Sequence, residues 1–371
     1  PLVLSIPRDY SPQTRYPLLV LLHGLGQRPR PDPDRICEEP VIRIWPWGRG
    51  DTGYRGLGAR DVWDAIEAVQ SWYSIDPDRI LLMGFSMGGH GAWSLAARRP
   101  YRFAAVGAVS GWPLPDLLLN LRDLPVHALH GGRDETVPVF FSRYAHAVLG
   151  PVNPRFIYRE VPGAGHGVRA LDTDPIAQAL IDAPPAGRRP LRFRIDHPAD
   201  LSLPGLTGLA FDQPHQPAWI QIDPPAQREA GPRWTTRNLA KVRVAPPGPA
   251  LLLDGQILTP AAGSPQTWIR TGTRWRPAPP AADAPRDYTS GAAAHLFEGE
   301  PLRIVIPAGG PAADLKTWSA AAADLARFAG AGKPMAAGAI PVCTDQTLTP
   351  VERRQCNLIL LGSPHHHAEI R

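Results

Sequence analysis

Cysteine is scarce in this chain, and the scarcity limits the chemistry that the sequence can support. Only Cys37, Cys343 and Cys356 occur among 371 residues. No Cys-x-x-Cys pair is present, which argues against a zinc or dithiol redox site, and we expect neither a metal nor a cofactor. Cys343 and Cys356 are close enough in sequence to form a disulfide in an exported protein. Two separate free thiols are the alternative, and both stay open.

Long apolar runs and basic clusters are also missing. No apolar stretch approaches the roughly 20 residues that span a bilayer, so we expect no membrane span. Only three of the 39 basic residues are lysine. Although the net charge is +5, no basic run or basic-aromatic stripe occurs in the sequence, so nucleic acid is not an expected partner.

The sequence leaves the cellular location and the oligomeric state open. The chain begins at Pro1 without a methionine, which is typical of a processed form or of a fragment. No signal peptide can be recognised in these residues. A secreted or periplasmic location is favoured slightly over a cytoplasmic one.

The first half of the chain alternates strand patterns with helix patterns. Unbroken apolar runs such as 79–85 and 103–111 predict strands that are buried on both faces. The spacing of apolar residues over 59–75 predicts a helix. We therefore expect residues 1–187 to form an α/β domain with a mostly parallel sheet and helices on both of its faces. Sites in such sheets lie beyond the carboxyl ends of the strands.

The composition changes after this first half. The chain has 45 prolines, concentrated in its second half. Residues 188–300 alternate short strand patterns with Pro and Gly turns and predict a β-sandwich-like module; Asp254-Gly255 between apolar runs indicates a hairpin there. Residues 301–371 return to strand and helix patterns. They predict a small α/β segment, which could be incomplete at Arg371.

The stretch "GFSMGGHGAW" (84–93) places a single serine between glycines, after a predicted strand and before a predicted helix. A tight turn at Ser86 would expose its hydroxyl above the sheet edge, and side chains at Gly84 and Gly88 would collide with the neighbouring backbone. This is the Gly-x-Ser-x-Gly pattern of a nucleophilic serine. The following helix directs its N-terminus at any negative charge that forms nearby.

A serine hydroxyl is a poor nucleophile unless a base accepts its proton and a carboxylate orients that base. In "HALHGGRDETVP", Asp134 follows a predicted strand and two glycines. In "VPGAGHGV", His166 lies in a glycine-flanked loop after the last predicted strand of the domain. The order Ser, Asp, His matches the order expected for this type of sheet, so we predict that Ser86, Asp134 and His166 form a catalytic triad.

An oxyanion hole is the third requirement of such chemistry. The strand in "LLVLLHGLGQ" ends at His23-Gly24-Leu25-Gly26, where glycines let the backbone approach a substrate. We predict that the N–H groups of Leu25 and Met87 form the hole. His23 is interpreted as a structural residue that orients this loop.

Taken together, "YPLLVLLHGLG", "GYRG", "ARDVWDAIEAV", "IDPDRILLMGFSMGGHGAW", "HGGRDETVP" and "GAGHG" resemble the α/β-hydrolase superfamily. The similarity covers residues 1 to about 185. It is greatest to the group of polyhydroxybutyrate depolymerases, feruloyl esterases and prolyl-oligopeptidase-like hydrolases. The resemblance implies serine hydrolase chemistry that needs no metal. It does not imply a role for the later modules.

These patterns predict a serine carboxylesterase that acts on short-acyl or aryl esters, small or polymer-linked, through an acyl-enzyme on Ser86. A serine peptidase with the same triad is the alternative. A polymer-binding protein with an inactive hydrolase scaffold is a third possibility, although no triad residue is missing. Trp112 could line the acyl pocket or serve packing alone. Tyr54 and Arg55 are weaker candidates for the mouth of the site.

Overall fold

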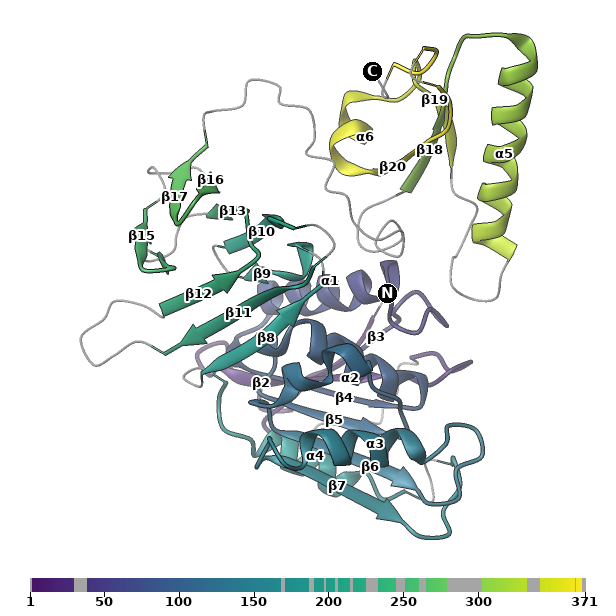
Figure 1. The fold of residues 1–371 in the computed structure, drawn as a ribbon. Coiled ribbons are helices and arrows are strands. Elements are labelled where there is room, and N and C mark those ends of the chain that lie inside the picture. Colours follow the sequence, from purple (N-terminus) through teal and green to yellow (C-terminus); the bar gives the residue numbers. More distant parts are fainter. Residues whose placement is uncertain are drawn as a thin grey trace.

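The computed structural model describes most of the chain, and its sheets form three successive units (Figure 1). The described residues are 2–29, 39–167, 171–186, 190–196, 198–203, 206–213, 216–224, 233–244, 251–259, 265–278, 302–331, 341–363 and 365–368. The expected boundaries at 187/188 and 300/301 lie outside them and stay predictions.

The first unit is a seven-stranded sheet in the order β1-β3-β2-β4-β5-β6-β7. Strand β1 is antiparallel to β3, and all other neighbours are parallel. The mostly parallel sheet expected from the sequence is therefore confirmed. Its strands are β1 (Leu2–Ser5), β2 (Tyr16–Leu22), β3 (Ile42–Pro46), β4 (Ile75–Phe85), β5 (Ala105–Val109), β6 (Val126–Gly131) and β7 (Phe156–Val161).

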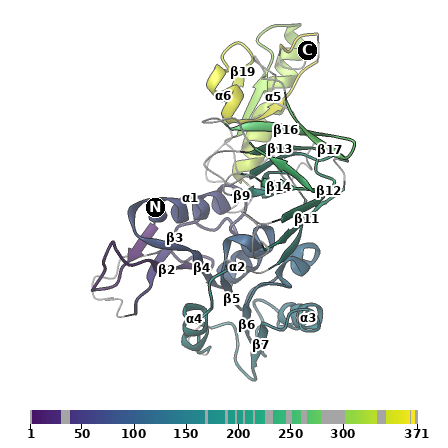
Figure 2. The same ribbon diagram turned by 90° about the vertical axis from the view of Figure 1, so that its left-hand side faces the viewer.

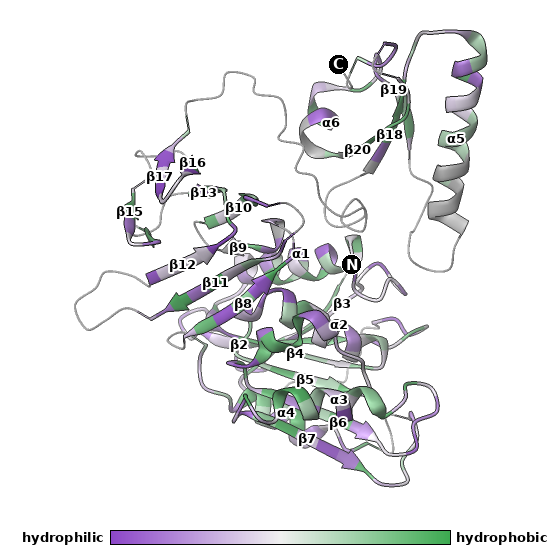
Figure 3. Cartoon of the chain, in the orientation of Figure 1, coloured by the Kyte–Doolittle hydropathy of each residue, from purple (hydrophilic) through white to green (hydrophobic). Residues whose placement is uncertain are grey.

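Helices cover both faces of this sheet because alternate strand residues point to opposite sides. Leu18 and Val20 enter one core, which α1 (Leu57–Trp72), α2 (Met87–Arg98) and α3 (Phe140–Leu149) complete. Leu19 enters the opposite core, which α4 (Asp174–Ile181) completes. Figure 2 shows α3 and α4 on opposite sides of β6 and β7. Figure 3 shows how apolar the central strands β4 and β5 are.

The N-terminal turn of α2 presses directly on the sheet backbone. A Cβ atom at Gly84 would lie 2.1 Å from the carbonyl oxygen of Gly88, and one at Gly88 would lie 2.1 Å from that of Leu22. A Cβ at Gly89 would lie 2.4 Å from the carbonyl oxygen of Val109. The expected collisions at Gly84 and Gly88 are therefore present, and they explain why this turn contains glycine.

The second unit is a sandwich of two five-stranded sheets, in the orders β17-β16-β13-β10-β9 and β15-β14-β12-β11-β8. Both sheets contribute to one apolar core, for example Phe193 and Trp234 from one, and Val242 and Trp275 from the other. The strands are β8 (Leu191–Ile195), β9 (Ser202–Leu203), β10 (Leu206–Ala210), β11 (Ala218–Asp223), β12 (Arg233–Arg237), β13 (Lys241–Val244), β14 (Leu251–Leu253), β15 (Gln256–Leu258), β16 (Gln266–Thr271) and β17 (Arg274–Pro277).

The hairpin expected at Asp254-Gly255 is also confirmed. Strands β14 and β15 pair antiparallel on either side of this dipeptide. The φ angles of Asp254 and Gly255 are 49° and 79°, and tight hairpins need such positive values at both central residues.

Polar contacts attach the sandwich to the first unit. The Asn120 side chain, in the 3₁₀ helix η2 (Pro115–Leu121), accepts a hydrogen bond from the N–H of Arg194 and donates one to its carbonyl oxygen. The Tyr101 ring packs 5.5 Å from that of Phe193, and its hydroxyl lies 3.0 Å from the carbonyl oxygens of Asp200 and Ser202. The hydrogen bonds of the buried Asn120 and the half-buried Tyr101 thus fix the sandwich on the first unit.

The third unit is a parallel sheet in the order β19-β18-β20 with two helices. Its elements are β18 (Leu302–Ile306), α5 (Ala312–Ala331), β19 (Val342–Thr344), α6 (Pro350–Gln355) and β20 (Asn357–Leu360). No disulfide joins Cys343 and Cys356, so of the two alternatives the structure has two separate thiols. Cys37 lies outside the described residues.

The close approach of α2 leads to a stability prediction. In Gly88→Ala, the new methyl group meets backbone atoms of Leu22 that cannot rotate away, so we expect a loss of about 3 kcal/mol or more in the free energy of unfolding. Urea unfolding followed by circular dichroism measures it. Gly24→Ala is the matched control, because its nearest neighbours would lie at 3.4 Å and belong to side chains. Equal stability of the two variants would contradict the packing described above.

Candidate active site

Ser86 occupies a strained turn between the last residue of β4 and the first residue of α2. Its φ and ψ angles are 58° and −117°, a region that residues other than glycine rarely adopt. The N–H of Ser86 donates to the carbonyl oxygen of Val109 at 2.9 Å, which ties the turn to the end of β5. The residue is 9% exposed, so its hydroxyl lies just below the surface, at the carboxyl edge of the sheet.

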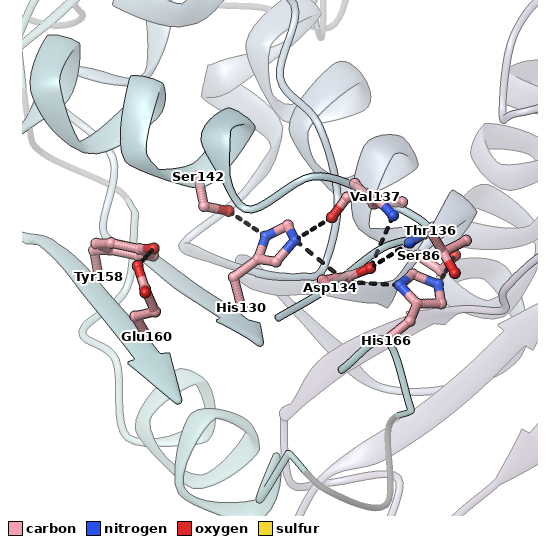
Figure 4. Close-up of polar contacts among 9 residues, drawn as sticks. All are labelled: Ser86, His130, Asp134, Thr136, Val137, Ser142, Tyr158, Glu160 and His166. Atoms are coloured by element: carbon pink, nitrogen blue, oxygen red, sulfur yellow. Dashed lines mark hydrogen bonds and ion pairs between the residues drawn. The ribbon is translucent and has the colours of Figure 1, made fainter. Parts of the chain in front are cut away.

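The structure brings the three predicted triad residues together (Figure 4). Asp134 lies in the loop after β6, and His166 lies in the loop after β7. Nε2 of His166 is 2.8 Å from the Ser86 hydroxyl oxygen, and Nδ1 is 2.7 Å from Oδ2 of Asp134. The three side chains therefore form one continuous line of hydrogen bonds, although 80 residues separate the serine from the histidine.

Asp134 is held in its ionised form by the donors around it. Oδ1 accepts hydrogen bonds from the N–H groups of Thr136 and Val137, and Oδ2 faces His166. Burial opposes ionisation, but the hydrogen bonds from His166 and from these two backbone groups outweigh it, so the pKa of Asp134 lies below its usual value. The carboxylate is thus charged at neutral pH and can stabilise a protonated imidazole.

A second histidine lies behind the aspartate, and the sequence had not indicated it. His130 is fully buried, with Nε2 3.4 Å from Oδ2 of Asp134. Nε2 donates to the carbonyl oxygen of Val137 at 2.9 Å, and Nδ1 accepts from the Ser142 hydroxyl at 2.7 Å. Burial lowers the pKa of His130, which keeps the ring neutral in this arrangement. His130 therefore fixes the loop that carries Asp134.

Two backbone N–H groups near Ser86 are available for a substrate oxygen. Within the described residues, neither Leu25 nor Met87 donates its N–H to a protein acceptor. Leu25 is 64% exposed on the loop after β2, and Met87 begins α2. An oxyanion hole requires unpaired N–H groups, so both residues remain candidates for it, as the sequence predicts.

Two aromatic side chains support the loop that contains Leu25. The ring nitrogens of His23 lie 2.9 Å from the carbonyl oxygens of Gly24 and Trp47. The Tyr54 hydroxyl donates to the carbonyl oxygen of His23 at 3.0 Å, and burial raises the pKa of this phenol. His23 thus has the contacts of a structural residue. The sequence position of Tyr54 made it a candidate for the mouth of the site. The residue is only 1% exposed, so it does not lie there.

Trp112 and Arg55 meet at a buried histidine one helical turn after Ser86. The ring of His90 stacks on that of Trp112 with centroids 4.5 Å apart, and its Nδ1 donates to the Trp112 carbonyl oxygen at 2.8 Å. Arg55 donates to Nε2 of His90 at 3.3 Å. His90 therefore orients the half-buried Trp112 and the exposed Arg55, and no substrate contact of either residue is established by these distances.

Among the described residues, no group of three or more His, Cys, Asp and Glu side chains is placed to hold a metal ion. No described helix is long and apolar enough to cross a bilayer.

A mostly parallel sheet with a serine at a strand-to-helix turn, followed in the chain by an aspartate and a histidine at later strand ends, is the arrangement of the α/β-hydrolase fold. Residues 59–172 match the family model of phospholipases and carboxylesterases. The resemblance to the esterases of the α/β-hydrolase superfamily is thereby confirmed for this part of the chain.

Curated relatives of this chain share only part of its length. A probable feruloyl esterase C of Aspergillus terreus is 28% identical over 37% of this chain and 56% of its own. A bifunctional acetylxylan esterase/xylanase of Neocallimastix patriciarum is 28% identical over 35% of this chain and 21% of its own. An uncharacterized secreted protein of Arthroderma benhamiae is 25% identical over 65% of this chain and 32% of its own. The matched part of this chain thus corresponds to between a fifth and just over half of the length of each relative.

Burial of His90 leads to a prediction about acid stability. Burial lowers the pKa of this histidine from 6.5 to about 4. Between these values the unfolded chain binds a proton that the folded chain does not, so the free energy of unfolding falls as the pH decreases through this window. One such proton contributes up to about 1.4 kcal/mol per pH unit.

We expect His90→Asn, whose amide can still donate to the Trp112 carbonyl oxygen, to reduce that slope by about one proton. Burial lowers the pKa of His127 and His130 as well, so part of the slope remains. Urea unfolding at a pH above 6.5 and at one between 4 and 6.5 measures the difference. His146→Asn, which changes an exposed histidine, is the control. An unchanged slope in His90→Asn would contradict a neutral His90.

Proposed function

We propose that this chain is a serine carboxylesterase that hydrolyses short-acyl or aryl esters through an acyl-enzyme on Ser86. The observation that carries the proposal is the line of hydrogen bonds from Ser86 to His166 to Asp134, at 2.8 and 2.7 Å. An aligned base on a strained, nearly buried serine has little use except to make that serine a nucleophile.

In the first half of the reaction, His166 Nε2 removes the proton of the Ser86 hydroxyl as its oxygen attacks the ester carbonyl carbon. The negative charge that forms on the carbonyl oxygen is stabilised by the N–H groups of Leu25 and Met87 and by the N-terminus of α2. When the tetrahedral intermediate collapses, protonated His166 gives its proton to the leaving alcohol. Asp134 stabilises the charged imidazole between these steps.

In the second half, a water molecule attacks the acyl-enzyme, and His166 now accepts the proton of that water. The same N–H groups stabilise the second oxyanion, and the acid leaves as Ser86 regains its proton. No step requires a metal or a cofactor, because the histidine and the backbone N–H groups supply both the proton transfer and the charge stabilisation.

The substrate class rests on the relatives and on the exposure of the site. The names of the two relatives indicate their substrates: a feruloyl ester is an aryl ester, and an acetylxylan ester is a short-acyl ester on a polymer. Leu25 is largely exposed, which favours an open site that a polymer-linked ester can reach. We infer an extracellular substrate, in keeping with a relative that is named a secreted protein.

The first test compares wild type with Ser86→Ala on p-nitrophenyl acetate, p-nitrophenyl butyrate, a feruloyl ester and an Ala-Pro p-nitroanilide. We expect ester turnover in the wild type. In Ser86→Ala, kcat/KM should fall by a factor of about ten thousand or more, because no other group replaces the nucleophile. Ser71→Ala, on the exposed face of α1, is the control. Faster cleavage of the anilide than of the esters would favour the peptidase alternative, and Ser86-independent turnover would contradict the mechanism.

The second test concerns His130, which does not contact the reacting atoms. His130→Gln loses the ring that joins Ser142 to the Val137 carbonyl oxygen, so the Asp134 loop moves and kcat should fall by about ten- to a hundredfold. We expect KM for small esters to stay within about twofold, since substrate contacts are distant. The pH profile of kcat separates the two causes: misplacement of the triad alters the profile, whereas partial unfolding lowers the active fraction and leaves the profile of the remaining enzyme unchanged.

A further inference from the structure

The sheet β15-β14-β12-β11-β8 of the sandwich has an outer face of unusual composition. Along β8, β11 and β12, buried residues alternate with outward residues, as a half-buried sheet requires. The outward positions are Arg192, Arg194, Trp219, Gln221, Asp223, Arg233, Thr235 and Arg237. The set contains four arginines, one aspartate and one tryptophan, and we call it the arginine–tryptophan face.

The strand register places Trp219 between two arginines. Trp219 pairs with Arg194 on one neighbouring strand and with Arg237 on the other. Directly opposed residues in antiparallel strands have Cβ atoms about 5 Å apart, so the three side chains rise from the sheet as neighbours. Trp219 is 43% exposed, which leaves much of its indole ring open to solvent.

The groups of this face are only partly used within the protein. Arg194 forms an ion pair with Asp196 at 2.6 Å, and Gln221 donates to Asp223 at 3.0 Å. In the part of the chain that the structure describes, the guanidinium groups of Arg192 and Arg237 have no ion pair or hydrogen bond. The exposed indole of Trp219 thus lies beside one unpaired cation, Arg237, and a second, Arg192, lies diagonal to it across the β8–β11 pair. This set of interactions is incomplete, and an external ligand can complete it.

The chemistry of the face indicates what that ligand contains. A flat, exposed indole stacks on the apolar face of a sugar ring. Arginine recognises carboxylates through two parallel N–H···O bonds. Gln221, Thr235 and Asp223 supply the short polar groups that sugar hydroxyls pair with. We propose that the arginine–tryptophan face binds a polysaccharide that carries carboxylate groups.

A single-stranded nucleic acid would also pair cations with an aromatic ring, but this face suits it less well. Such strands are held by several aromatic side chains on which successive bases stack. Here Trp219 is the one exposed aromatic residue on the described part of the face, so successive bases would find only one ring to stack on. A uronic acid polymer needs only one stacked ring per binding site and tolerates a carboxylate that accepts hydroxyl hydrogen bonds.

The arginine–tryptophan face belongs to the same molecule as the Ser86 site, so a polymer bound to it stays near that site. The sandwich is attached to the first unit, which carries Ser86, through Asn120 and Tyr101. A polymer bound to the sandwich is therefore kept at a high effective concentration beside the Ser86 site of the same molecule. The binding itself does not depend on Ser86 chemistry, so it can be tested in an inactive protein.

The test uses the full chain with Ser86→Ala, to exclude any turnover, in affinity electrophoresis and calorimetry. The probes are polygalacturonate, a methylglucuronoxylan, a neutral arabinoxylan and an oligo(dT) strand. We expect binding to both acidic polymers, weaker binding to the neutral one, and loss of the preference at about 1 M salt, where the Debye length is about 3 Å. Trp219→Ala should weaken all polysaccharide binding by about tenfold or more.

Arg237→Gln should weaken binding to the acidic polymers alone and reduce its salt dependence. Trp72→Ala, which removes a tryptophan that is 61% exposed on α1, and Arg276→Gln, on the other sheet of the sandwich, are the matched controls. Thermal unfolding midpoints verify that each variant is folded. Three results would overturn the proposal: no binding to acidic polymers, equal binding in Trp219→Ala, or tighter binding to oligo(dT) than to any polysaccharide.

Discussion

The contact between the first turn of α2 and the sheet is the constraint on which the site depends. Because Gly84 and Gly88 have no Cβ, backbone meets backbone at distances that no side chain would allow. The chain can then reverse within one residue, and Ser86 takes up the strain as a positive φ angle. The same reversal directs the serine hydroxyl out of the sheet edge and leaves the N–H of Met87 beside it. The strain at Ser86 and the roles proposed for its hydroxyl and for the Met87 N–H thus all depend on one packing contact.

The other half of the site is held by a line of hydrogen bonds that begins well away from the serine. Ser142 on α3 orients His130, His130 holds the Val137 carbonyl oxygen, and the Val137 N–H holds Asp134. Asp134 in turn orients His166 toward Ser86. Backbone hydrogen bonds also join the loops after β6 and β7, from the Gly132 N–H to the Val161 carbonyl oxygen and from the Arg133 N–H to the Ala164 carbonyl oxygen. Helix α3 therefore contributes to the alignment of Ser86, His166 and Asp134, although it carries none of these residues.

Local patterns made much of this architecture predictable. Buried strands are continuous apolar runs, and turns that need glycine contain it, so the parallel sheet and the positions of Ser86, Asp134 and His166 at strand ends could be inferred. The role of His130 could not be inferred, because a histidine that donates to one carbonyl oxygen has no sequence pattern of its own. Strand β4 begins at Ile75, earlier than expected, since "DPDR" resembles a turn. The Tyr54 environment depends on a loop that folds back over α2.

Cross-strand register explains why the arginine–tryptophan face was invisible in the sequence. Arg194, Trp219 and Arg237 are 18 or more residues apart, and only the pairing of β8, β11 and β12 makes them neighbours. A basic-aromatic stripe was absent as a linear pattern, yet the fold assembles one from three strands. Because a slip of one residue would turn Trp219 into the core, the same register that buries Phe193 and Ile220 also exposes Trp219. The packing of the sandwich and the composition of its outer face are therefore a single property of the strand alignment.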